Sequence, residues 1–320
     1  MCAHRCFRSV GPMNQNLLLT TYFSDWIDTY KRGAVRPVTF HKYETSLKRL
    51  TEIAAGMRLT TLDRRAYQGI LNTYAQTHER QTTLDFHHHL RAALLDAVDD
   101  GLLEHDPTRK AVAKGAVRRV HAAKYLSLGQ LTDLLGVLDL DGSRAWDTFL
   151  YLVAKTGLRF AEALALTPAD INPAQHTLTV SRTWDYKSAI PGFAPTKNRS
   201  SVRTVSIDAE TTRVLGPLTA RTPREQTLFI TPGARVFNDT VNHHLRRQCI
   251  AASVPVVTVH GLRHTHASVL LYAGVSVASV ARRLGHATMT TTQRTYLHII
   301  QELEALDDAK VLGCLDSLSR

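Results

Sequence analysis

The sequence predicts a mainly α-helical protein with a small antiparallel β-sheet, arranged as two domains. Apolar residues recur at helical spacing four times in the first hundred residues, and again in the second half of the chain. Two segments of the second half are instead rich in Thr and Val and alternate as strands do. The chain has 320 residues, of which 44% are apolar and 21% charged, which is typical of a globular protein with room for two domains.

The first predicted domain is a helical bundle. Its apolar stripes fall within residues 17–30, 40–53, 66–74 and 84–98. The last stripe ends near Gly101, a residue type that favours helix termination. We therefore expect an N-terminal tail over residues 1–15 and a bundle of four or five helices over residues 16–107.

A basic linker is predicted over residues 108–124, which contain no large aromatic side chain. Its six positive residues are Arg109, Lys110, Lys114, Arg118, Arg119 and Lys124. We interpret this segment as an interdomain linker whose cations lie along DNA phosphates. A merely solvated connector is the alternative.

The second domain is expected over residues 125–320. Ser127 and Gln130 have the spacing of a capping box at the start of a helix. Residues 144–156 are predicted to form an apolar helix that ends at Gly157, because glycine is a good C-terminal cap.

Two strands and a return to helices are predicted in the rest of this domain. The strands are residues 177–184 and 201–207, with a stretch containing Pro and Gly, 189–200, between them. Helices resume from residue 238, and residues 302–318 carry the apolar stripe of a C-terminal helix.

Charge and targeting signals narrow the class of protein. The formal net charge is +11, which favours an anionic partner, most commonly nucleic acid. No apolar run approaches the ~20 residues that span a bilayer, and the N-terminus lacks a signal-peptide core. We therefore expect a cytoplasmic protein without a membrane partner.

No metal site and no cofactor are expected. The four cysteines are too few and too dispersed for a disulfide framework. Three consecutive histidines, His87 to His89, lie on the fourth predicted helix, where neighbouring side chains point in different directions. We interpret them as surface or core-edge groups.

Six residues of the second domain are candidates for chemistry on a phosphate: Arg159, Lys197, His260, Arg263, His286 and Tyr296. An arginine fork can hold two phosphate oxygens, and phosphoryl transfer gains most from positioning and charge, so cations can replace a metal. A free tyrosine is phenolate only about once in a thousand at pH 7, so it needs a base or a positive field. Each residue alone also has a structural explanation; the combination favours catalysis.

These residues lie in segments that resemble the tyrosine recombinase, or phage integrase, family. TGLRFAEALAL resembles its first arginine box, and HGLRHTHAS its second box. LGH, followed ten residues later by Tyr296, resembles its third box and nucleophile helix. PTKNRSSVRT resembles the hairpin that carries the family's lysine. KYETSLKRL and LRAALLDAVDDGLLEHDP resemble the core-binding domain, more loosely.

The resemblance implies a role for each candidate on the phosphate. Arg159 and Arg263 would hold the non-bridging oxygens of the scissile phosphate. His286 would bond the same phosphate, and His260 would bond it or accept the tyrosine proton.

It also implies covalent catalysis. Tyr296 would attack and form a 3′-phosphotyrosyl bond, and Lys197 would protonate the leaving 5′-oxygen. Glu162, one helical turn after the first arginine, His264 and His298 would support the site without reacting. The implied activity is site-specific integration or excision of a mobile element or phage.

The implied partners are double-stranded DNA bearing core recombination sites and further copies of the chain. We expect a monomer when free and a tetramer in the synapse, with residues 302–318 either docking on a neighbouring protomer or packing on their own domain. Accessory DNA-bending or directionality factors are also implied. Larger integrases carry an arm-binding domain before the bundle; its absence here indicates either a minimal Xer-like layout or a shortened chain.

Two other functions fit parts of the pattern. A type IB topoisomerase uses a similar set of Arg, Lys, His and Tyr, but the LGH box and the helical N-terminal module favour recombination. A DNA-binding protein that has lost its chemistry is the other alternative, although none of the family's catalytic positions is substituted.

Overall fold

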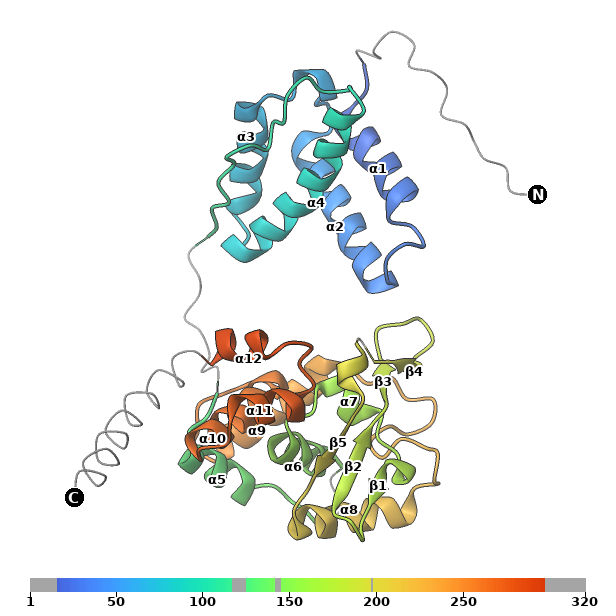
Figure 1. Cartoon of the computed structure of the whole chain (residues 1–320), viewed down its shortest axis with the longest axis vertical. Coiled ribbons are helices and arrows are strands. Elements are labelled where there is room, and N and C mark those ends of the chain that lie inside the picture. The colour runs from blue at the N-terminus through green and yellow to red at the C-terminus, as the bar shows by residue number, and fades with distance from the viewer. Residues whose placement is uncertain (1–15, 117–124, 142–144, 197, 297–320) are drawn as a thin grey trace, which may run out of the picture. The chain divides into compact units, whose positions relative to one another are not determined.

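The computed structural model describes residues 16–116, 125–141, 145–196 and 198–296. The chain divides into two compact units, Met1–Val120 and His121–Arg320, and each is described by itself (Figure 1). Among the described residues, no helix is both long and apolar enough to cross a bilayer.

The N-terminal unit is helical, which confirms the predicted bundle. Its elements are α1 (Leu19–Tyr30), α2 (Pro37–Ala54), the 3-10 helix η1 (Leu59–Thr61), α3 (Arg64–Ala75) and α4 (Arg80–Asp99). Each helix buries the apolar stripe seen in the sequence; Phe23, Leu50, Tyr67 and Leu90 are fully enclosed in the common core. Gly101 follows α4 with a φ of +71°, as its predicted place after the helix requires.

The three consecutive histidines lie at the edge of this core, as interpreted. The hydroxyl of Tyr67 lies 2.8 Å from Nδ1 of His87, and that of Ser46 lies 2.8 Å from Nδ1 of His89. His88, between them, is exposed.

The described part of the predicted linker lies against the N-terminal unit. The Gln68 side chain bonds both the N–H and the carbonyl of Val112, at 2.9 Å each. The N–H of Ala116 donates to the carbonyl of His78 at 2.9 Å. Three of the predicted phosphate-contacting residues are exposed on this segment: Arg109, Lys110 and Lys114. The other three lie outside the described residues: Arg118, Arg119 and Lys124.

Eight helices are described in the C-terminal unit: α5 (Leu128–Gly136), α6 (Ala145–Thr156), α7 (Phe160–Leu164), α8 (Ala209–Arg221), α9 (Asn238–Ala251), α10 (Val259–Tyr272), α11 (Val277–Leu284) and α12 (Met289–Thr295). Helix α6 is the centre of the core, since Phe149, Leu150 and Leu152 are fully enclosed. The capping box of Ser127 and Gln130 is present at the start of α5. Gly157 ends α6 with a φ of +68°, so both sequence predictions are confirmed.

Five short strands form two antiparallel sheets on one side of this unit (Figure 1). One sheet has the order β1-β2-β5, from β1 (Ile171–Asn172), β2 (Thr177–Val180) and β5 (Arg203–Ser206), with Leu178 opposite Val205. The other is a hairpin of β3 (Arg182–Asp185) and β4 (Gly192–Pro195), with Trp184 opposite Phe193.

Two strand predictions were wrong in detail. Residues 177–184, predicted as one strand, are divided at Ser181 between the two sheets, although the alternation of residue types continues across the break. Strand β4 lies inside the stretch 189–200, where Pro and Gly argued against a strand. Proline is tolerated at the end of an edge strand, and Pro195 is the last residue of β4 in a two-stranded sheet. The predicted C-terminal helix, 302–318, lies outside the described residues.

Candidate active site

Arg263 is buried at the meeting point of three segments. Helix α10 begins at the cap residue Thr258, whose hydroxyl accepts from the N–H of Gly261 at 3.1 Å. Arg263 then lies on the second turn and is only 3% exposed. Its Nη1 donates to the carbonyl of Gly157 at 2.6 Å, and its Nη2 donates to that of Leu284 at 2.7 Å. Burial and the nearby charge of Arg159 lower the pKa of Arg263 to about 9, which leaves it positive at neutral pH.

Arg159 is placed beside it by the sharp turn between α6 and α7. A Cβ added at Gly157 would lie 2.6 Å from Cδ2 of His266, so this left-handed position needs glycine. Arg159 then caps α7, where its N–H and Nη1 donate to the Glu162 carboxylate at 3.0 and 2.6 Å. Its Nη2 donates to the carbonyl of Gly285 at 3.0 Å, and the side chain remains 37% exposed.

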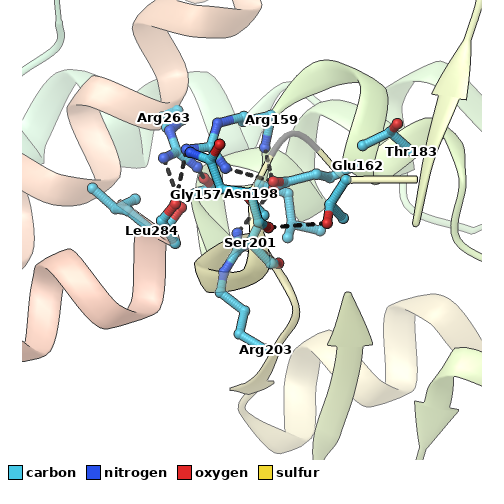
Figure 2. A network of polar contacts seen from close by, with 12 residues as sticks. Gly157, Arg159, Glu162, Thr183, Asn198, Ser201, Arg203, Arg263 and Leu284 are labelled. Carbon is cyan, nitrogen blue, oxygen red and sulfur yellow. Dashed lines mark hydrogen bonds and ion pairs between the residues drawn. The ribbon is translucent and has the colours of Figure 1, made fainter. Parts of the chain in front are cut away.

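A third arginine, Arg203 of β5, shares the same carboxylate (Figure 2). Its Nη2 donates to Oε2 of Glu162 at 2.9 Å, while Arg159 bonds Oε1. Glu162 is 1% exposed; burial alone would raise its pKa, but the ion pairs with Arg203 and Arg159 lower it below its ordinary value. The carboxylate is therefore ionised and joins the two guanidinium groups.

His286 is the second residue after α11. Gly285, with a φ of +66°, ends the helix and turns the chain. Nδ1 of His286 lies 2.7 Å from the hydroxyl of Thr292, and burial together with Arg263 and Arg159 lowers the pKa of His286 to about 4. The imidazole is therefore neutral at pH 7. If the Thr292 hydroxyl donates to Nδ1, Nε2 carries the proton and is a donor.

Tyr296 ends α12 and lies in a small apolar cluster with Ala267, Leu271 and Leu284. It is 2% exposed, and its hydroxyl lies 2.8 Å from Nδ1 of His264. Burial raises the pKa of Tyr296 to about 12, although the positive charge of Arg263 opposes the shift.

His260 and His264 lie one turn apart on α10. Their ring centroids are 4.6 Å apart in an edge-on arrangement, and the ring of His260 reaches solvent. Partial desolvation and the charges of Arg263 and Arg159 lower the pKa of His260. The resemblance named His260 as a candidate acceptor for the tyrosine proton, whereas the structure places His264 against the Tyr296 hydroxyl.

His266 and Arg283 support this centre from the side of α6. Nδ1 of His266 lies 2.9 Å from the carbonyl of Ala154, and Nε2 lies 2.9 Å from Nε of Arg283, which donates to it. Burial and then the charge of Arg283 lower the pKa of His266 to about 3. This neutral histidine lies directly beside Gly157.

The structure therefore brings five of the six predicted catalytic residues into one centre. Arg159, Arg263, His260, His286 and Tyr296 are linked by the contacts and charges above. Lys197 and His298 lie outside the described residues.

Three residues of this centre were not predicted from the sequence: Arg203, Arg283 and His266. One signal was present for Arg203: it lies two residues before Val205, on the same face of a strand whose Val205 is buried. A charged residue on a buried face indicates an enclosed ion pair.

The arrangement suits an anion with several oxygens. Each guanidinium keeps N–H donors beyond those that bond carbonyls and the Glu162 carboxylate, so Arg159 and Arg263 can hold an oxyanion. The Tyr296 hydroxyl lies within electrostatic reach of Arg263, and a tyrosine oxygen is a type of group that can act as a nucleophile. Among the described residues, no three His, Cys, Asp or Glu side chains gather closely enough to hold a metal ion.

Comparisons with known proteins agree with this chemistry. The profile of the phage integrase family matches residues 124–302, more than half of the chain. A tyrosine recombinase XerC-like protein of Caldanaerobacter subterraneus subsp. tengcongensis is 25% identical over 335 aligned residues, covering 92% of this chain and 84% of that protein. The integrase of Staphylococcus phage L54a is 26% identical over 166 residues, so the chain spans about half (47%) of that relative.

Solved structures share the fold. The Tn1549 transposon integrase, in complex with a circular intermediate DNA, has a TM-score of 0.75 and 17% identity, covering 91% of this chain and 99% of that one. A lambda integrase tetramer bound to a Holliday junction has a TM-score of 0.64 and 17% identity, covering 88% and 83%. The chain thus belongs to the phage integrase family, the tyrosine recombinases, whose members are site-specific DNA recombinases.

Proposed function

We propose that this protein is a site-specific recombinase that cleaves and rejoins DNA through a covalent bond to Tyr296, in the integration or excision of a mobile element or phage. The observation that carries the proposal is that Arg263 lies within electrostatic reach of both Tyr296 and His286, beside Arg159, while His264 contacts the Tyr296 hydroxyl. Cations that can hold a phosphate and a nucleophile that can attack it thus lie in one centre.

The proposed reaction exchanges one phosphate ester for another. The Tyr296 oxygen forms a bond to phosphorus, and the bond from phosphorus to the 5′-oxygen breaks. The phenol proton passes to a histidine, and Lys197 gives a proton to the leaving 5′-oxygen. Arg159, Arg263 and the Nε2 donor of His286 stabilise the charge that builds on the non-bridging oxygens. A 5′-hydroxyl of the partner duplex then reverses these steps, so the reaction requires no cofactor.

Proton removal is the demanding step for Tyr296. With a pKa of about 12, the hydroxyl is phenolate in only about one molecule in 10⁵ at pH 7. The proton therefore leaves as the bond to phosphorus forms, to an acceptor within hydrogen-bond reach. We propose that either His264, which already contacts the hydroxyl, or His260 beside it takes the proton.

The proposed partners are double-stranded DNA with core recombination sites and three further copies of the chain in a synapse. The lambda integrase tetramer on a Holliday junction supports this assembly by analogy. The exposed cations of residues 108–116, together with Arg118, Arg119 and Lys124, would follow the DNA backbone. We further propose docking of residues 302–318 on a neighbouring protomer, help from accessory DNA-bending or directionality factors, and action on the nucleoid in the cytoplasm of a bacterial host.

Covalent trapping tests the proposal. Nicked suicide duplexes from a library of genomic junction sequences are incubated with the protein, and we expect a protein–DNA adduct on a subset of sequences. Tyr296→Phe should abolish the adduct; an adduct that survives this change contradicts the mechanism. A reaction of two duplexes bearing the trapped sequence should give exchanged strands, whereas relaxation of supercoils without exchange indicates a topoisomerase.

A further inference from the structure

Arg203 is a buried cation with three bonds inside the protein. Its side chain is 7% exposed. Nε donates to the carbonyl of Arg283 at 2.6 Å, Nη1 to that of Ser201 at 3.0 Å, and Nη2 to Glu162 at 2.9 Å. Because every nitrogen of this guanidinium already bonds protein oxygen, Arg203 is poorly placed to hold substrate.

The three arginines meet at the end of α11. Arg203, Arg263 and Arg159 donate to the carbonyls of residues 283, 284 and 285 in that order. These are the last carbonyls of the helix and the first after it, which lack partners within the helix and carry its negative end. One turn of backbone thus sets the position of all three guanidinium groups.

Arg203 also links this turn to the loop between β4 and β5. The loop carries Lys197, and its described residues are held by a bond from the Ser201 N–H to the carbonyl of Asn198 at 3.0 Å. Nη1 of Arg203 bonds the carbonyl of the same Ser201 (Figure 2). A Cβ added at Gly285 would lie 2.9 Å from Nη1 of Arg203 and 3.1 Å from the carbonyl oxygen of Ser200, so loop and turn are in close contact.

We propose that Arg203 is a positioning residue for phosphoryl transfer. It fixes Arg159 through the shared Glu162 carboxylate, and it holds the lysine-bearing loop against the end of α11. This inference rests on the proposed recombinase function, because it assigns Arg203 to the same scissile phosphate without contact to it.

A single-turnover cleavage assay tests the proposal, with Arg203→Gln and Arg203→Lys as variants. Its substrate is a suicide duplex that carries a sequence identified by the covalent-trapping experiment. The control is Asp147→Asn, because the Asp147 carboxylate is as deeply buried as that of Glu162 but has other partners. Asp147 bonds His244 and Gln248 at 2.6 and 2.9 Å and has no bond to Arg159, Arg203 or Arg263. We expect Arg203→Gln to slow cleavage by up to about 100-fold, as for misplacement of a catalytic group by about 1 Å, with less than about threefold change in DNA affinity. Arg203→Lys should recover part of the rate.

Two modified duplexes separate positioning from general damage. A methylphosphonate at the scissile position removes the charge that Arg159 would balance, and a 5′-bridging phosphorothiolate supplies a leaving group that needs no proton. The loss of cleavage rate caused by Arg203→Gln should be smaller on both modified duplexes, because each duplex makes one of the groups that Arg203 positions unnecessary.

The outcomes are distinct. A rate within about threefold of wild type on the natural phosphate, or an equal loss on all three duplexes, overturns the positioning role. If Arg203→Gln does not fold, Arg203→Lys answers the same question on the three duplexes. Failure of the wild-type protein to form an adduct overturns the recombinase function instead, and the inference with it.

Discussion

The hydroxyl of Tyr296 lies 2.8 Å from Nδ1 of His264; Tyr296 is buried and His264 is half-buried. Tyr296 is thus held by a specific side-chain partner. The contact defines the resting place of the proposed nucleophile.

Loss of this contact should be measurable in stability. Tyr296→Phe and His264→Leu each remove one partner, and a double-mutant cycle on the free energy of unfolding should give a coupling of about 1 kcal/mol. Urea denaturation measures it. Additive single changes would contradict a native hydrogen bond between the two side chains.

Stability should fall as the pH falls below neutrality. Burial lowers the pKa of His286 to about 4 and that of His266 to about 3, from an ordinary value of 6.5. Between pH 6.5 and the lowered pKa values, the folded protein therefore binds fewer protons than the unfolded chain. The free energy of unfolding thus decreases as the pH falls below 6.5. Urea denaturation at about pH 7.5 and about pH 5 should show the loss. His286→Gln combined with His266→Gln should flatten the dependence, and His88→Gln, at an exposed position, should leave it unchanged.

Gly285→Ala should destabilise the protein more than Gly274→Ala does. Both glycines have left-handed φ values, +66° and +82°, so both substitutions carry backbone strain of about 1–2 kcal/mol. Only Gly285 has a close neighbour, since an added Cβ would lie 2.9 Å from Nη1 of Arg203, whereas nothing lies within 4 Å at Gly274. Thermal unfolding compares the two, and equal losses would exclude the close approach.

Lys114→Gln should weaken DNA binding in a salt-dependent manner. Lys114 is exposed on the segment that follows the N-terminal bundle. If its charge neutralises one phosphate, the slope of log affinity against log salt should become shallower by about 0.9. Arg213→Gln is the control, because Arg213 is an exposed cation of α8 that pairs with Glu210 at 2.6 Å. An unchanged slope for Lys114→Gln would favour the solvated-connector interpretation.

Most helical parts of the fold were predictable because their signals are local, although helix α8, which lies before residue 238, was not predicted. Spacing of apolar residues identifies each bundle helix, the pair Ser127 and Gln130 marks a cap, and Gly157 marks a helix end. The break at Ser181 was not predictable, since residues 177–184 keep one alternating pattern while the chain passes from one sheet to another. Which sheet a strand joins depends on distant partners, here β5 and β4.

The candidate site shows the same limit. Motifs singled out Arg159, Arg263, His286 and Tyr296, but they could not show that three arginines bond consecutive carbonyls at residues 283–285. That relationship depends on backbone carbonyls, which every residue carries and which a sequence motif therefore cannot reveal. For the same reason, Arg203 was not singled out from the sequence, and His264 was predicted only to support the site.

His264 contacts the Tyr296 hydroxyl and Arg263 acts on it electrostatically, so a single copy of the chain can supply both the proposed nucleophile and its cation. If the same arrangement acts on DNA, a defective copy cannot borrow a missing residue from its neighbour. Mixing Tyr296→Phe protein with Arg263→Ala protein should not restore cleavage at any ratio. In mixtures with wild-type protein, adduct formation should fall in proportion to the fraction of defective copies at the cleaved sites.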